Sequence, residues 1–240
     1  MIVYVNGDSY SCESDGKRYS EFLGETYNCD VINRSIGGSC NSRIIRSSLR
    51  ELINLKKTHT NILAVIGLSF IFRSEVWNTI DQLERFKNQD DGEFTSYQFA
   101  HGNNWFQNKA VSSTTPSHLK DYAKQWLTYY NPEAEITNLF ANIIGLHAWC
   151  MQNQIRLLIF SGPGMEKIEL SSPFIKPFND YISNSANFID LFNFSFCKYC
   201  TSSGFVAPDH DVLGDLGHHG QKAHRHFSNY LVEYIQHYEI

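Results

Sequence analysis

The chain has 240 residues, of which 42% are hydrophobic and 19% charged, and its formal net charge is -5. This composition is typical of a globular protein and excludes an intrinsically disordered one. The negative charge, without a dense cluster of Lys and Arg, argues against a nucleic-acid partner, and no apolar run approaches the roughly 20 residues of a membrane span. We expect a single domain spanning 1–240.

The first apolar segment, residues 2–6, has no basic residues before it and is too short for the apolar region of a signal peptide. We interpret it as a strand. The sequence therefore predicts synthesis in the cytoplasm, and it leaves open an export route together with a larger assembly.

Short apolar segments rich in β-branched and aromatic residues recur along the chain, separated by helical patterns. Continuous apolar runs of this length are typical of parallel strands buried on both faces. The predicted strands are 2–6, 30–33, 62–66, 155–160 and 188–191. The predicted fold is a three-layer α/β/α sandwich with a central parallel sheet of about five strands.

Three stretches carry apolar side chains at helical spacing. One runs from Ile44 to Leu52, and another runs from Ile136 to His147 in a helix predicted over about 132–153. The third follows residue 220 and continues almost to the last residue. We expect these stripes to face the core rather than a cofactor.

Residues from about 70 to 130 do not fit this alternation, and we interpret them as an insertion between the third strand and the helix at 132. Long loops in such places commonly cover functional sites. The insertion is rich in aromatic, imidazole and amide side chains, including Trp77, Tyr97, His101, Asn103, Asn104 and Trp105. Such side chains suit a saccharide, so an acetylated sugar is one candidate substrate. Packing of the aromatic rings against the domain is the equal alternative.

The tripeptide Gly7-Asp8-Ser9 directly follows the first predicted strand. A serine in this position can present its hydroxyl at the carboxyl edge of a parallel sheet, where open α/β folds bind their ligands. The alternative is that Ser9 only caps a helix.

Asp215 lies three residues before His218, and both precede the last predicted helix. A nucleophilic serine needs a base, and the base needs a partner that fixes its tautomer, so this pair could supply both. His219 competes for the role of base, and Asp209 and Asp211 compete less well for the role of acid because their spacing is wrong. A chance Asp and His pair in a His-rich segment is the alternative.

Glycines follow the second and third predicted strands. Gly37 and Gly38 come after residues 30–33, and Gly67 precedes Leu68 and Ser69. A glycine at such a place lets the backbone approach a ligand closely, and its N–H can donate to an oxyanion.

Four blocks, taken in chain order, resemble the SGNH hydrolase superfamily, also called GDSL-like lipases and esterases. The first is Gly7-Asp8-Ser9, the second contains Gly37 and Gly38, the third is Gly67-Leu68-Ser69, and the fourth runs from Asp215 to His218. The blocks are short, but together they span nearly the whole chain. The resemblance implies that Ser9 is the nucleophile, His218 the base and Asp215 the acid. It also implies an oxyanion hole formed by the N–H groups of Ser9 and Gly38 with Ser69 as a third donor, and it implies no cofactor and no metal.

Ser69 departs from the family pattern, which has an asparagine whose amide donates to the oxyanion. Loss of one such donor typically costs on the order of 100- to 1,000-fold in rate. If Ser69 is a weak donor, Ser69→Asn should preserve or raise turnover. If the pocket is built around Ser69, with a water or a residue of the insertion in the asparagine's role, Ser69→Asn and Ser69→Ala should both lose activity.

The function implied by the resemblance is hydrolysis of an acyl ester or an O-acetyl group, including one on a saccharide, through an acyl-enzyme. The alternative class is a catalytically inactive binding or structural module on the same fold, within an assembly such as a virion or surface complex; the altered third block favours it. A phosphate or nucleotide binder of flavodoxin type would need a glycine-rich loop after the first strand, and Asp8 would repel phosphate.

The six cysteines are irregularly spaced, which favours reduced thiols. Cys197 and Cys200 have the spacing of half a zinc site, to which His210 could add a ligand, but the chain has no second cysteine pair. The favoured interpretation is two ordinary thiols.

Overall fold

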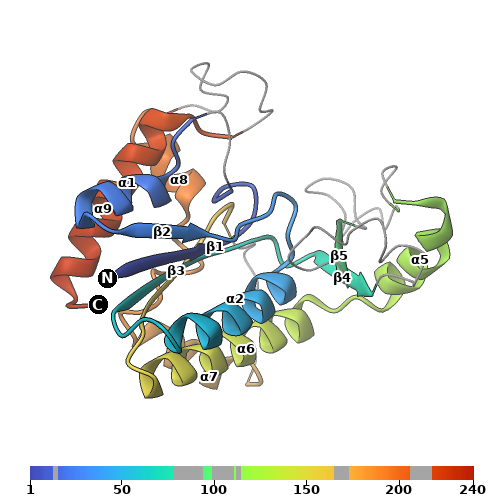
Figure 1. Cartoon of the computed structure of the whole chain (residues 1–240). Helices are drawn as coiled ribbons and strands as arrows, with labels where there is room; N and C mark the ends of the chain where they lie inside the picture. Colours follow the sequence, from blue (N-terminus) through green and yellow to red (C-terminus); the bar gives the residue numbers. More distant parts are fainter. Residues whose placement is uncertain (13–15, 78–93, 99–110, 112–114, 165–172, 206–217) are drawn as a thin grey trace.

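In the computed structural model, a parallel sheet lies between two layers of helices (Figure 1). The structure describes residues 1–12, 16–77, 94–98, 111, 115–164, 173–205 and 218–240. The strand order is β2-β1-β3-β6, formed by β1 (Ile2–Asn6), β2 (Asp30–Asn33), β3 (Ile62–Leu68) and β6 (Arg156–Ser161). The predicted three-layer α/β sandwich with a parallel sheet is confirmed.

Both faces of the sheet are buried. Successive residues of a strand point to opposite faces, so Ile2 and Tyr4 of β1 join one apolar cluster while Val3 and Val5 join the other. Because helices cover both faces, β1 and β3 are buried along their whole length, and this is why apolar runs identified them in the sequence.

Among the described residues, three helices pack on each face of the sheet (Figure 1). One layer consists of α2 (Asn41–Lys56), α6 (Pro132–Gln152) and α7 (Lys176–Ser183), and the other of α1 (Tyr19–Tyr27), α8 (Phe196–Ser202) and α9 (Gln221–His237). The start of α6 is as predicted: the Asn131 side chain accepts hydrogen bonds from two backbone N–H groups of the first turn, and Pro132 follows it.

The fifth predicted strand, 188–191, is present only as one parallel bridge between Phe188 and Ile159 of β6. The chain turns away directly afterwards, because the backbone oxygen of Asp190 accepts from the N–H of Phe194 and its carboxylate accepts from the N–H of Asn193. An aspartate that bonds the backbone ahead of it is typical of a turn. The apolar run alone did not show this turn, so the predicted strand was too long.

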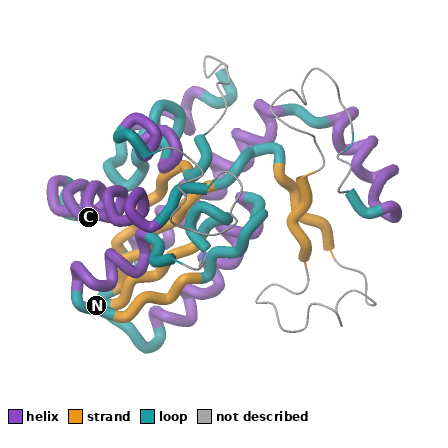
Figure 2. Tube along the Cα trace, turned by 90° about the horizontal axis from the view of Figure 1, so that it is seen from above, coloured by secondary structure: helices purple, strands orange, loops and turns teal. Residues whose placement is uncertain are grey.

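Part of the predicted insertion forms a separate two-stranded antiparallel sheet and a helix, beyond the carboxyl end of the main sheet (Figures 1 and 2). Its elements are β4 (Arg73–Trp77), β5 (Phe94–Gln98), the short 3-10 helix η1 (Ser117–Leu119) and α5 (Lys120–Tyr129). An ion pair of 2.7 Å between Arg46 on α2 and Glu75 on β4 joins this part to the main sheet's helices. Of the residues that suggested a saccharide, Trp77 and Tyr97 lie in β4 and β5, and the others, His101, Asn103, Asn104 and Trp105, lie outside the described residues.

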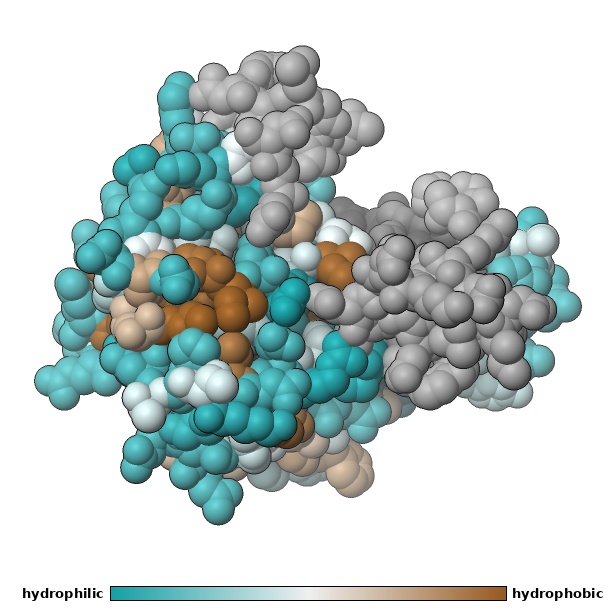
Figure 3. Space-filling model, viewed as in Figure 1, coloured by the Kyte–Doolittle hydropathy of each residue, from teal (hydrophilic) through white to brown (hydrophobic). Residues whose placement is uncertain are grey.

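The β2 edge of the sheet brings apolar side chains to the surface (Figure 3). Val31 and Ile32 of this edge strand are half-buried, and Ile36, in the loop after it, is exposed.

Within the described parts of the chain, no helix combines the length and apolar character that crossing a membrane requires.

Candidate active site

Ser9 lies in the turn after β1, and the last residue of β1 fixes the start of this turn. The amide nitrogen of the buried Asn6 donates to Ile44 O at 3.1 Å and to Ser47 Oγ at 2.9 Å, both on α2. Its amide oxygen accepts from the N–H of Gly7 at 2.9 Å. The end of the strand is therefore held to α2 directly before the turn begins.

Gly7 allows the turn to pass close to β3. A Cβ atom at this position would lie 2.5 Å from Ser11 Oγ and 3.0 Å from the backbone oxygen of Gly67, which is too close for any other residue. The chain then places Asp8 in the interior and Ser9 at the carboxyl edge of the sheet.

Ser9 and His218 are in hydrogen-bonding contact although they are 209 positions apart in the chain: Ser9 Oγ lies 2.8 Å from Nε2 of His218. The His218 ring also packs against Tyr10, with ring centroids 4.8 Å apart. This is the contact that a nucleophile and its base require. Asp215, the predicted acid, lies outside the described residues, so its role stays a prediction.

His219 faces a different environment from His218. It is 2% exposed, and its ring packs edge-on against Phe196 with a centroid distance of 5.5 Å. Of these two neighbouring histidines, the one that contacts Ser9 is His218, while its role as the base stays a prediction.

Arg18, which the sequence patterns did not single out, holds the segment that follows His218. This buried residue precedes α1, and its Nη1 donates to the backbone oxygen of His219 at 3.2 Å and lies 2.8 Å from Nε2 of His224. Because it fixes the residue next to His218, we interpret Arg18 as a positioning residue. Nothing in the sequence distinguishes a buried arginine from the many exposed ones.

His224, in the first turn of α9, faces hydrogen-bond donors on both ring nitrogens. Nδ1 lies 3.3 Å from the N–H of Tyr19, and Nε2 faces Arg18. Burial, and then the positive charge of Arg18, hold the pKa of His224 well below its usual value. A protonated ring would bring a buried positive charge against the guanidinium.

This environment predicts a loss of stability on acidification. Because the folded-state pKa of His224 is depressed, its contribution is fully present above the unfolded value near 6.5 and declines as the pH falls below it. We expect the free energy of unfolding to be lower at pH 5.5 than at pH 7.5 on account of this group, by on the order of 1 kcal/mol. Urea unfolding of the wild type and of His224→Gln at both pH values measures the difference.

His226→Gln, on the same helix, is the matched control and should keep the wild-type difference. If the free energy of unfolding of His224→Gln fell between pH 7.5 and pH 5.5 by as much as that of the wild type, another group would be responsible.

The loop after β2 lies beside Ser9. The N–H of Ile36 donates to the backbone oxygen of Gly7 at 3.2 Å, and a Cβ atom at Gly37 would lie 3.8 Å from the Cβ of Ser9. Gly38 has a φ of 80°, in the left-handed region that favours glycine. The structure thus brings the second block to the first, while the donation of the Gly38 N–H to an oxyanion stays a prediction.

Ser69 follows β3 and is fully buried. Its hydroxyl donates to Oδ2 of Asp8 at 2.7 Å, and its N–H donates to the side-chain oxygen of Asn41 at 2.7 Å. Burial raises the pKa of Asp8, while the hydrogen bond from Ser69 and the charge of Arg73 oppose this rise. The third block therefore meets the first through Asp8 rather than through Ser9.

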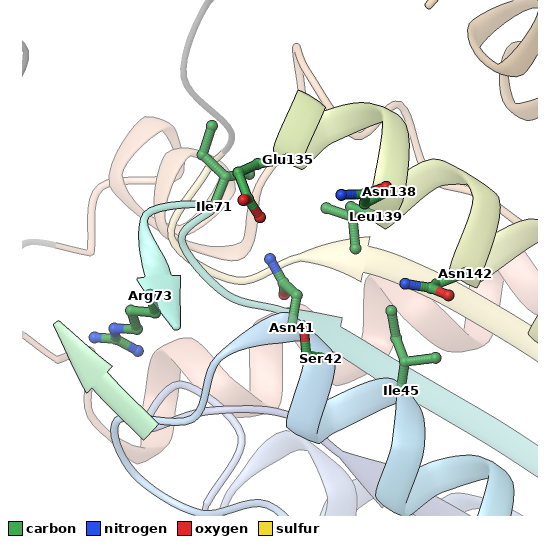
Figure 4. Close-up of a pocket in the computed structure, with 9 residues that line it drawn as sticks. All are labelled: Asn41, Ser42, Ile45, Ile71, Arg73, Glu135, Asn138, Leu139 and Asn142. Atoms are coloured by element: carbon green, nitrogen blue, oxygen red, sulfur yellow. The ribbon is translucent and has the colours of Figure 1, made fainter. Parts of the chain in front are cut away.

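A small polar pocket lies next to this cluster, with a volume of about 30 Å³ (Figure 4). This is space for little more than one water molecule. Its lining comes from α2, α6 and the segment after β3, and consists of Asn41, Ser42, Ile45, Ile71, Arg73, Glu135, Asn138, Leu139 and Asn142. Burial raises the pKa of the Glu135 carboxyl.

Cys197 and Cys200 are both free thiols on α8. Burial raises the pKa of Cys197 to about 12, which disfavours the thiolate that a metal would need. Across the described ranges, no group of three or more His, Cys, Asp or Glu side chains could hold a metal ion, and His210 lies outside them.

The chain has similar solved structures at low sequence identity. No protein-family model matches the chain, and a search of curated proteins gives no match. Similar solved structures are those of GDSL-type lipolytic proteins and of acetylxylan esterases. Because the sequence identities and TM-scores of these structures are low, the likeness carries no argument about activity or substrate.

Three of these structures show the extent of the likeness. The acetyl xylan esterase AlAXEase has 13% identity and a TM-score of 0.46, over 97% of this chain and 98% of its own. A variant of Axe2, an acetyl-xylooligosaccharide esterase from Geobacillus, has 12% identity and a TM-score of 0.43, over 98% and 93%. A lipolytic protein of the G-D-S-L family from Veillonella parvula has 10% identity and a TM-score of 0.43, over 97% and 96%.

Proposed function

We propose that the protein is a serine hydrolase that cleaves an ester through Ser9, His218 and Asp215. The observation that carries this proposal is the 2.8 Å contact between Ser9 Oγ and His218 Nε2. The two residues come from opposite ends of the chain, and they meet at the sheet edge where α/β folds bind ligands. A serine that only capped a helix would have no need of this histidine.

The proposed reaction is a two-step acyl transfer. Ser9 Oγ attacks the ester carbonyl carbon while His218 Nε2 takes the hydroxyl proton, and Asp215 stabilises the imidazolium. The tetrahedral intermediate then collapses, and His218 gives its proton to the leaving alcohol. Water repeats the sequence on the acyl-enzyme, which releases the acid and restores Ser9.

For the substrate, we propose a short acyl ester, with an O-acetyl group on a saccharide as the preferred case. The sequence shows no long uninterrupted apolar segment that could form a lid, which favours a short acyl group over a long apolar chain. The saccharide rests only on the aromatic and amide composition of residues 70–130.

Labelling with a fluorophosphonate tests whether Ser9 is an activated nucleophile before any substrate is known. We expect the wild type to be labelled and Ser9→Ala to be unlabelled, because the probe phosphonylates only a serine with a working base. Ser183→Ala, at an exposed position of α7, is the control and should be labelled like the wild type.

A folded wild-type protein that is not labelled, or a Ser9→Ala variant that still is, would contradict the proposal. In the first case the inactive binding or structural module becomes the better interpretation.

A further inference from the structure

Arg73, the first residue of β4, joins the three segments that surround Ser9. Its Nη1 lies 3.1 Å from Oδ2 of Asp8, 2.8 Å from Oγ of Ser69 and 3.4 Å from the backbone oxygen of Ser39. Asp8 directly precedes Ser9, and Ser39 directly follows the glycines of the second block. The guanidinium therefore lies where the loops after β1, β2 and β3 meet.

The hydroxyl of Ser69 is already engaged in this cluster. A serine hydroxyl has one proton, and here Ser69 donates it to Asp8 while its oxygen accepts from Arg73. Ser69 therefore has no proton for an oxyanion in this arrangement.

Arg73 is held firmly and is well shielded from water. Its side chain is 12% exposed, and its guanidinium carbon lies 5.0 Å from the centre of the Phe70 ring. A guanidinium has five N–H donors in a fixed plane, so the contacts through Nη1 orient the whole group. A fixed cation away from water stabilises a developing negative charge more strongly than a solvated one does.

We propose that Arg73 stabilises the oxyanion, and that Asp8 and Ser69 serve to hold its guanidinium in place. This inference rests on the proposed function. When Ser9 Oγ bonds to the carbonyl carbon, the π electron pair moves onto the carbonyl oxygen, and Arg73 donates to that oxygen together with the backbone N–H groups. The pair returns to the carbon–oxygen bond when the alcohol leaves, and Arg73 keeps its protons throughout.

The test compares Arg73→Gln and Arg73→Lys on a short acyl ester. We expect Arg73→Gln to lower kcat by about 100- to 1,000-fold with a much smaller change in KM, because the charge on the oxygen develops only in the transition state. Arg73→Lys keeps the charge but not the planar donors, and should recover part of the loss. The rate of fluorophosphonate labelling should fall in parallel, since the phosphonyl oxygen takes the position of the oxyanion.

Arg46→Gln is the matched control, because it removes an arginine that also holds β4 but pairs with Glu75 away from Ser9. It should keep the wild-type kcat, and thermal unfolding should show Arg73→Gln folded at the assay temperature. Under the same inference, Ser69→Ala and Ser69→Asn should both lower kcat, because each disturbs the contact that holds Arg73.

The outcomes separate this inference from the function on which it rests. A labelled and active wild type with an equally active Arg73→Gln would overturn the role of Arg73 and leave the hydrolase intact. Higher turnover in Ser69→Asn would return the donor role to position 69 and would also overturn it. A wild type that neither hydrolyses esters nor reacts with the probe would overturn both.

Discussion

Replacement of His218 by alanine should abolish ester hydrolysis, and so should replacement of Ser9. Members of a catalytic triad act as a unit, so either change is expected to lower kcat by about 10⁶-fold. The reason lies in the 2.8 Å contact between Ser9 Oγ and His218 Nε2, through which His218 takes the Ser9 proton in the proposed reaction. Initial rates on a short acyl ester, with active-site titration by the probe, measure the effect.

His219→Ala is the matched control for this prediction. The His219 ring packs against Phe196, so its loss should lower the melting temperature while the folded protein keeps most of its activity. The opposite result, in which His219→Ala is inactive and His218→Ala retains activity, would show that the base is wrongly assigned.

Replacement of Phe227 by alanine should cause a large loss of stability. This side chain is fully buried on α9, and its ring lies 4.9 Å from that of Phe196, 5.0 Å from that of Phe160 and 5.5 Å from that of Tyr19. A cavity among these rings should lower the free energy of unfolding by about 3–5 kcal/mol. Urea denaturation followed by tryptophan fluorescence measures it.

Tyr129→Ala is the comparison, because this aromatic side chain on α5 is exposed and its loss should change stability by no more than about 0.5 kcal/mol. If Phe227→Ala were as stable as Tyr129→Ala, the aromatic cluster would not be what holds α9 to the sheet.

The sequence predicted the elements whose side chains repeat regularly. β1 and β3 are apolar runs, and α2, α6 and α9 have long apolar stripes. Helices α7 and α8 were missed because they are too short to show a period, and α1 has a glycine, Gly24, in its middle. Helix α5 was missed within the region assigned as an insertion.

For the candidate site, the motifs predicted the residues that lie at the ends of regular elements. Ser9 could be paired with His218 because Ser9 follows the first predicted strand, and His218 precedes the last predicted helix and lies three residues after Asp215. Arg73 could not be placed, because its contact with Asp8 joins positions 65 apart and no local pattern reports such a contact. What the sequence offered was the exchange of asparagine for Ser69, which left open a weaker oxyanion hole, a donor from the insertion, an unusual substrate or lost catalysis.

The distance of 209 positions between Ser9 and His218 has a consequence for the protein while it is being made. The ribosome synthesises Ser9 early and His218 late. At about 5–20 residues per second, the interval between them is roughly 10–40 s. Through this interval the nascent chain holds a serine without its histidine. In the proposed function, the protein cannot act on its surroundings until His218 and the residues of α9 have been synthesised and have docked against the sheet.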